Sequence, residues 1–252
     1  MQKLPTGVYT LLAEYYDVFF NFHVDWYRRA RRELLGGILP RVRVACDLAC
    51  GTGNTALELA ARGIEMYGVD LSPTMCRLAR AKIRRAGCQA TIQQGDMRTF
   101  RLPQPVDLVT CEFDALNHVP RKQDLARVTR AVARALHPGG TFYFDLNNRL
   151  AFQKIWPGSG WFEEPDVVMA MKGGYDASRD KGWTEVEWFV RGKGGWQRRR
   201  ERVEQVAWPR REVLETLRAA GFRRISAHDA VPFFPGHSRI RPHCRTFYVA
   251  QK

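Results

Sequence analysis

The sequence predicts an α/β fold: a doubly wound sheet of seven strands with an antiparallel β insertion after the fifth strand. Short apolar runs alternate with helical patterns over roughly the first 150 residues, as expected for a largely parallel sheet. The turn Gly51-Thr52-Gly53 joins the first apolar run to a helix. Between about residues 165 and 208, short strands separated by glycine pairs replace this alternation. These three observations determine the predicted architecture.

Residues 1–36 are expected to form a helical N-terminal cap. Tyr15, Tyr16, Phe19 and Phe20 recur there at a spacing close to that of a helix. Tyr16 combines an aromatic body with a polar tip, so it is a candidate lid that excludes water from a bound ligand. Packing in the core is the alternative for the same side chain.

Five strands and three helices should follow the cap. Ser72-Pro73 is a capping residue followed by proline at the first helical position, and Gly63 and Gly87 are natural helix stops. Pro138-Gly139-Gly140 turns the chain into the fifth strand. The expected strands are 42–48, 64–69, 88–94, 106–111 and 141–146, and the expected helices are 55–62, 72–87 and 121–136.

Residues 159–208 are expected to form the antiparallel insertion. Three strands are predicted there, at 167–169, 184–190 and 203–208. A helix over 209–220 and strands at 224–228 and 245–250 then return to the main domain, which comprises residues 37–158 and 209–252. The insertion should form either a roof over a substrate or a contact within a homodimer.

The composition favours a cytoplasmic protein with reduced thiols. No apolar run reaches the roughly 18 residues that a membrane span needs, so we expect no membrane association. The six cysteines show neither a disulfide framework nor convincing ligand spacing, so we expect no metal. Forty Lys and Arg against 26 Asp and Glu give a formal charge of +14, which would attract anionic partners. Because the Arg residues are spread along the chain, RNA is a weaker candidate partner than a small molecule.

Polar residues mark the ends of four predicted strands, at the edge where open parallel sheets bind ligands. Asp47 belongs to the first strand end, Asp70 to the second, Asp96 to the third and Glu112 to the fourth. The glycines of the turn after the first strand let the backbone approach a ligand closely. A carboxylate such as Asp70 can accept hydrogen bonds from both hydroxyls of a ribose. We therefore expect a nucleotide-like cofactor at this edge.

The segment Asp47-x-x-x-Gly51-x-Gly53 resembles motif I of the class I S-adenosylmethionine-dependent methyltransferases. The strand pair expected near the end of the chain is similar to the antiparallel pair that closes the sheet of that fold. The resemblance implies S-adenosylmethionine as the cofactor, with Asp96 accepting from the adenine amino group and Met97 against the ring. It assigns these residues to cofactor binding: Asp47, Ala49, Gly51, Gly53, Asn54, Asp70, Leu71, Asp96, Met97, Glu112 and Phe113.

Shorter segments resemble small-molecule N-methyltransferases of the glycine and amino-sugar types. They are Tyr15-Tyr16-Asp17-x-Phe19-Phe20, Gln94-Gly95-Asp96-Met97-Arg98 and residues 113–119. This resemblance implies methyl transfer to nitrogen, and less readily to oxygen, of a small metabolite. His118 matches a histidine position in some amino-sugar enzymes and is a candidate general base, since histidine titrates near neutral pH. Capping of the following helix is the other interpretation of His118.

Three other functions stay open. Gly51-x-Gly53-x-x-Ala56 also fits the loose dinucleotide fingerprint of dehydrogenases, with Asp70 as the ribose acceptor. The basic surface is compatible with an RNA methyltransferase, and a cofactor-binding protein without turnover would carry the same motif. Neither the methyl acceptor nor the oligomeric state follows from the sequence.

Overall fold

A seven-stranded sheet lies at the centre of the computed structural model, which describes residues 10–231, 233 and 241–252. Its strands are β1 (Val44–Leu48), β2 (Glu65–Asp70), β3 (Ala90–Gln94), β4 (Val106–Cys111), β5 (Leu136–Asn147), β10 (Arg224–Asp229) and β11 (Arg245–Gln251). The strand order is β10-β11-β5-β4-β1-β2-β3. Neighbours among β1 to β5 pair in parallel, whereas β11 runs antiparallel to β5 and β10. The predicted doubly wound sheet of seven strands is confirmed.

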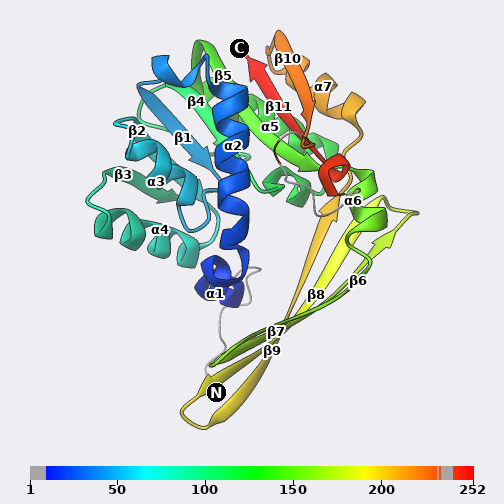
Figure 1. The fold of residues 1–252 in the computed structure, drawn as a ribbon. Helices are drawn as coiled ribbons and strands as arrows, with labels where there is room; N and C mark the ends of the chain where they lie inside the picture. Colours follow the sequence, from blue (N-terminus) through cyan, green and yellow to red (C-terminus); the bar gives the residue numbers. More distant parts are fainter. Residues whose placement is uncertain (1–9, 232, 234–240) are drawn as a thin grey trace.

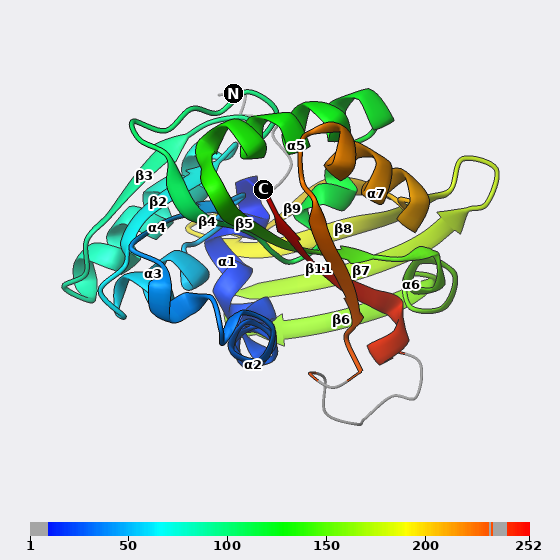
Figure 2. The same cartoon turned by 90° about the horizontal axis from the view of Figure 1, so that it is seen from above.

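Helices cover both faces of this sheet (Figures 1 and 2). They are α1 (Thr10–Phe20), α2 (Val24–Leu35), α3 (Asn54–Ala60), α4 (Pro73–Arg85), α5 (Lys122–Ala135), α6 (Arg149–Lys154) and α7 (Arg210–Ala219). α5 and α7 contribute Leu125 and Leu217 to one buried core. α2, α3 and α4 contribute Leu35, Leu59 and Ile83 to the other. The central sheet therefore lies between two packed layers of helices.

The predicted helices are present, together with one that was not expected. The expected helical cap is formed by two helices, α1 and α2, joined by a 3-10 turn at Asn21–His23. Residues 1–9 of the predicted cap lie outside the described residues. α6 was not predicted, although Asn148 caps it by accepting from the backbone N–H groups of Leu150 and Ala151, at 3.0 and 3.3 Å.

A second, antiparallel sheet follows α6. Its strands are β6 (Gly158–Glu164), β7 (Val167–Asp176), β8 (Lys181–Gly192) and β9 (Gly195–Val206), paired in that order. The prediction of three strands was wrong because it omitted β6. This strand carries Gly158 and Gly160 and is largely exposed, so it shows no alternation of apolar and polar residues. The long β7, β8 and β9 extend away from the central sheet and pass beside α1 (Figure 1).

Helix α1 packs against the inner face of the second sheet. The ring of Tyr15 stacks on Trp188 with centroids 5.9 Å apart, and Phe19 lies 6.0 Å from both Trp188 and Phe162. Trp188 is fully buried. The second sheet therefore holds α1 in place. Among the described residues, no helix is both long and apolar enough to cross a bilayer.

We predict that Trp188→Ala releases α1 from the second sheet. Removing a large buried aromatic side chain costs about 3–5 kcal/mol, and here the lost contacts are those that hold α1. In hydrogen–deuterium exchange, the α1 amides should exchange at least about tenfold faster, while β1 and β4 stay protected. Trp196→Ala is the matched control, since that side chain of the same sheet is 48% exposed. Unchanged exchange of α1 in Trp188→Ala would contradict this packing role.

Candidate active site

The turn after β1 has a backbone that suits glycine. Gly51 and Gly53 have φ angles of +52° and +83°, and Ala49 before them has φ +57°. A Cβ added to Gly53 would lie 3.0 Å from the Cβ of Ala79 on α4, which is closer than side chains normally approach. A Cβ added to Gly51 would instead meet open space. Gly53 therefore lets the turn pack closely against α4, and the space next to Gly51 is open.

Asp70 fixes this turn from the end of β2. Its two carboxylate oxygens accept from the backbone N–H groups of Gly51 and Ser72, both at 2.8 Å. Burial raises the pKa of Asp70, and the two N–H groups oppose that rise. Because each carboxylate oxygen has two lone pairs, both can still accept a further hydrogen bond.

A cavity opens between the first two helices and the ends of β1 and β4. Seven of the predicted site residues line it: Tyr16, Asp47, Ala49, Gly51, Asn54, Glu112 and Phe113. Its other lining residues include Phe20, Tyr27, Arg31, Thr52 and Thr55, which the sequence-based prediction did not contain. The structure therefore brings the ends of the first and fourth strands together, as expected.

Carboxylates and one arginine meet inside this cavity. Asp47 is 3% exposed, and the Thr110 hydroxyl donates to it at 2.8 Å. Burial, reinforced by the charge of Glu112, raises the pKa of Asp47 to about 7. Arg31 of α2 forms an ion pair with Glu112 and another with Glu58. Although burial opposes the charge of Arg31, these carboxylates raise its pKa.

Two atoms of this cluster have no hydrogen-bond partner among the residues that the structure describes. They are Nε of Arg31 and Oε1 of Glu112, and both are buried. Buried polar atoms are nearly always hydrogen-bonded, since leaving one unpaired costs about 1–3 kcal/mol. The site therefore offers a donor and an acceptor that suit a zwitterionic or cationic ligand.

A second charged cluster lies at the ends of β4 and β5. Arg245 of β11 forms ion pairs with Asp145 and with Asp114, the latter at 2.7 Å. Tyr27 of α2 donates to Asp145 at 3.1 Å. Burial, opposed by the charge of Arg245, raises the pKa of Asp145 to about 6. Phe113 and Asp114 both have positive φ angles, of 62° and 53°, a conformation that costs non-glycine residues about 1–2 kcal/mol each. The ion pairs and hydrogen bonds of this cluster hold the strained turn.

Helix α1 closes over the glycine turn. Asp17 accepts from the Thr52 hydroxyl at 2.6 Å and from the Asn54 amide at 3.3 Å, and it forms an ion pair with Lys82 at 2.6 Å. Beside it, Tyr16 meets the edge of Phe113 with ring centroids 6.0 Å apart. This placement agrees with a lid, but the lid role of Tyr16 stays a prediction.

The remaining predicted residues lie outside the cavity lining. Leu71 follows β2 and is 67% exposed. Asp96 pairs with Arg98, whose side-chain hydrogen bond lowers the pKa of Asp96, while Met97 packs on the core. Their roles at the adenine stay predictions.

His118 ends a 3-10 turn, η3 (Ala115–His118), after β4. The histidine is partly buried, and burial lowers its pKa. Its Nε2 lies 3.0 Å from the amide nitrogen of Gln205 on β9. Among the described residues, no group of three or more His, Cys, Asp or Glu side chains could hold a metal ion.

Comparison with known proteins identifies the domain. Residues 45–140 match the family described as a methyltransferase domain. The YqeM protein of Bacillus subtilis (strain 168), whose name assigns it to the methyltransferases, is 28% identical over 85% of this chain and 86% of its own length. A dTDP-4-amino-2,3,4,6-tetradeoxy-D-glucose N,N-dimethyltransferase of Saccharopolyspora spinosa is 35% identical, over only 51% of each protein.

The fold agrees with this assignment. The crystal structure of an S-adenosylmethionine-dependent methyltransferase from Clostridium acetobutylicum ATCC 824 superposes with a TM-score of 0.79 at 22% identity. The match covers 96% of this chain and 98% of that one. The chain therefore has the class I methyltransferase fold, and its residues 45–140 match the methyltransferase domain family.

We predict that Asp47 makes stability fall as the pH rises. Its folded-state pKa of about 7 exceeds the ordinary 3.8, so its contribution to stability is complete below about pH 4 and is lost as the pH rises through 7. Asp47→Asn keeps an oxygen for Thr110 but does not titrate. Between about pH 5 and 8, the free energy of unfolding of Asp47→Asn should fall less than that of the wild type. Urea denaturation should show a difference on the order of 1–3 kcal/mol. Asp25→Asn, at an exposed helix position, is the control. Parallel pH profiles of Asp47→Asn and the wild type would rule out this titration.

Proposed function

We propose that this chain, which carries a methyltransferase domain, transfers the methyl group of S-adenosylmethionine to an amino nitrogen, or less readily an oxygen, of a small metabolite. One observation carries the proposal: a cavity at the ends of β1 and β4 is lined by carboxylates and closed by the aromatic side chains of α1. S-adenosylmethionine supplies a methyl group on a positively charged sulfur. The carboxylates Asp47 and Glu112 favour such a cation inside the protein.

The residues around the cavity fit the parts of this cofactor. Asp70 has acceptor capacity left for the two ribose hydroxyls. The unpaired acceptor of Glu112 suits an ammonium group, and the unpaired donor of Arg31 suits a carboxylate. Asp96 and Met97, at the end of β3, are proposed to contact the adenine. Open space at Gly51 leaves room for the ligand beside the turn.

Methyl transfer depends mainly on positioning and on exclusion of water. Tyr16, Phe20 and Phe113 form an aromatic contact group over the cavity, with ring centroids 5.4 and 6.0 Å apart. Asp17 ties the helix that carries two of them to the glycine turn. We propose that this arrangement holds the nucleophile in line with the methyl group. His118 is a candidate base for a protonated nucleophile on sequence grounds, and capping of the following helix is its other interpretation.

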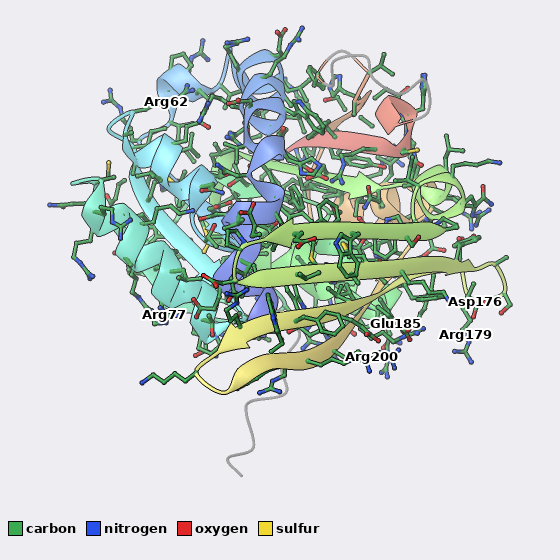
Figure 3. The ribbon with its side chains drawn as sticks, turned by 60° about the horizontal axis from the view of Figure 1, so that its bottom comes forward. Arg62, Arg77, Asp176, Arg179, Glu185 and Arg200 are labelled. Carbon is green, nitrogen blue, oxygen red and sulfur yellow. The ribbon has the colours of Figure 1, made fainter. Side chains whose placement is uncertain are left out.

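A small acceptor is favoured over RNA. The relative from Saccharopolyspora spinosa is named for methylation of a nucleotide-linked amino sugar, which is a small amine. Arginines on one face of β9 are already paired: Arg200 lies 3.5 Å from Glu185 of β8 (Figure 3), and Arg202 lies 2.9 Å from the same carboxylate. These pairs offset part of the positive charge that this face would offer to an RNA phosphate backbone.

The remaining sequence-based expectations become part of this proposal. We propose residues 1–36 as a cap, residues 37–158 and 209–252 as the cofactor domain, and residues 159–208 as the roof of the acceptor site. A contact between two copies through that sheet is the alternative use of the roof. A cytoplasmic location accords with the proposed small acceptor.

The proposed function is tested by methyl transfer from radiolabelled S-adenosylmethionine to defined acceptors. A thymidine-diphosphate-linked 4-amino sugar should be methylated, and the matching 4-hydroxy sugar should react at least about tenfold more slowly. Bulk RNA is the third acceptor. Transfer to RNA alone, with binding that falls steeply as salt rises, would replace the small-molecule proposal by the RNA one. Cofactor binding without transfer to any acceptor would favour a non-catalytic protein.

We predict that Asp70→Ala weakens S-adenosylmethionine binding by at least about tenfold. The change removes both proposed ribose contacts and two hydrogen bonds that shape the glycine turn, and each charged hydrogen bond contributes about 1.5–3 kcal/mol. Affinity is measured by calorimetry, and circular dichroism verifies that the variant is folded. Asp25→Ala, on the exposed side of α2, is the control. Wild-type affinity in a folded Asp70→Ala protein would exclude the ribose role.

A further inference from the structure

Gln205 is a buried amide at the inner end of an exposed, charged strand. It is 3% exposed, whereas Arg198 and Arg200 of the same strand lie at the surface. β9 runs from its outer tip back to the central domain, where it meets the 3-10 turn η3 (Figure 1). The second sheet therefore places one polar side chain beside Asp114 and His118.

The contacts of Gln205 fix which way its amide points. Its nitrogen donates to Asp114 at 2.5 Å, and its oxygen accepts from the Asn147 amide at 3.4 Å. Asp114 is paired with Arg245 at 2.7 Å, so its carboxylate acts as an acceptor and requires a donor from Gln205. The opposite amide orientation would set two acceptors against each other.

This amide orientation determines which ring nitrogen of neutral His118 carries the proton. The same amide nitrogen lies 3.0 Å from Nε2 of His118, and an amide nitrogen can only donate. Nε2 therefore accepts, and the proton of the neutral ring belongs on Nδ1. The burial that lowers the pKa of His118 agrees with a neutral ring. The charge of Asp114, in the same segment, raises the pKa of His118 and so opposes the effect of burial. Asp114 is itself paired with Arg245 of β11.

We propose that Gln205 is a positioning residue that holds His118 neutral, with its proton on Nδ1 and its Nε2 occupied by the Gln205 amide, so that His118 does not remove a proton from the acceptor. This inference rests on the proposed function. The acceptor amine then binds in its neutral form. Its lone pair forms the new N–C bond as the S–C bond breaks, and the methylated ammonium releases its proton to solvent.

The test reads the protonation of His118 directly. Two-bond proton–nitrogen NMR spectra of the full-length protein with 15N-labelled histidine distinguish the two neutral tautomers, and loss of one signal in His118→Asn gives the assignment. We expect the wild type at pH 7 to show His118 neutral, with its proton on Nδ1. Gln205→Glu replaces the donor by an acceptor, so it should move the proton to Nε2 and raise the His118 pKa by about 1–3 units. Gln205→Met, which is uncharged, should abolish the preference for Nδ1.

Gln197→Glu is the matched control. It makes the same chemical change on the same strand at an exposed position, and it should leave the His118 spectrum unchanged. A wild-type proton on Nε2, or an Nδ1 proton that persists in both Gln205 variants, would overturn the proposal. These spectra need no acceptor, so failure to find methyl transfer would refute the proposed function without deciding the tautomer.

A kinetic comparison tests directly whether His118 is a base. Neither asparagine nor phenylalanine can take up a proton at this position. With the thymidine-diphosphate-linked amino sugar, His118→Asn and His118→Phe should each keep kcat within about tenfold of the wild type and keep its pH profile. Equal loss of kcat in both variants, with loss of the acidic limb of the wild-type pH profile, would show that His118 is a base and would overturn the proposal.

Discussion

Buried negative charge at the carboxyl ends of the central strands is the constraint on which the site depends. Asp47, Glu112, Asp114 and Asp145 end the first, fourth and fifth strands, and in the described structure they are met by Arg31 and Arg245. Burying a charge is costly unless a partner compensates it, which is why burial raises the pKa of Asp47 and Asp145 toward neutrality. A chain with net positive charge thus encloses a cavity lined by carboxylates. A positively charged cofactor would compensate the negative charge of these carboxylates.

The N-terminal helices and the second sheet cover this buried charge. α2 supplies Arg31 and Tyr27 from one face, and α1 seals the glycine turn through Asp17. The other face of α1 packs on Trp188 of the second sheet, and these contacts help to hold the helix there. The same sheet sends Gln205 to the second carboxylate cluster. The second sheet therefore supports both the proposed lid and the carboxylate cluster at the ends of β4 and β5.

The sequence predicted the central sheet and the strand ends because both depend on local patterns. It could not predict which arginine of the run Arg28-Arg29-Ala30-Arg31-Arg32 is buried, since that depends on packing against β4; the four-residue spacing of Tyr27, Arg31 and Leu35 on one buried helix face was the available signal. β6 was missed because its exposed side chains and glycines show no alternation. Gln205 was missed because its importance comes from contacts with residues 87 to 91 positions away.

The central claim is that the acidic cavity is a site for S-adenosylmethionine, and calorimetric titration of the cofactor-stripped protein tests it most directly. Titrations at pH 7 in buffers with different ionisation enthalpies would give both the affinity and the number of protons exchanged. We expect S-adenosylmethionine to bind with release of protons, because a cation beside Asp47 lowers its pKa from about 7. NAD and NADP should not bind. Binding of a nicotinamide nucleotide in place of S-adenosylmethionine would contradict the account and favour a dehydrogenase.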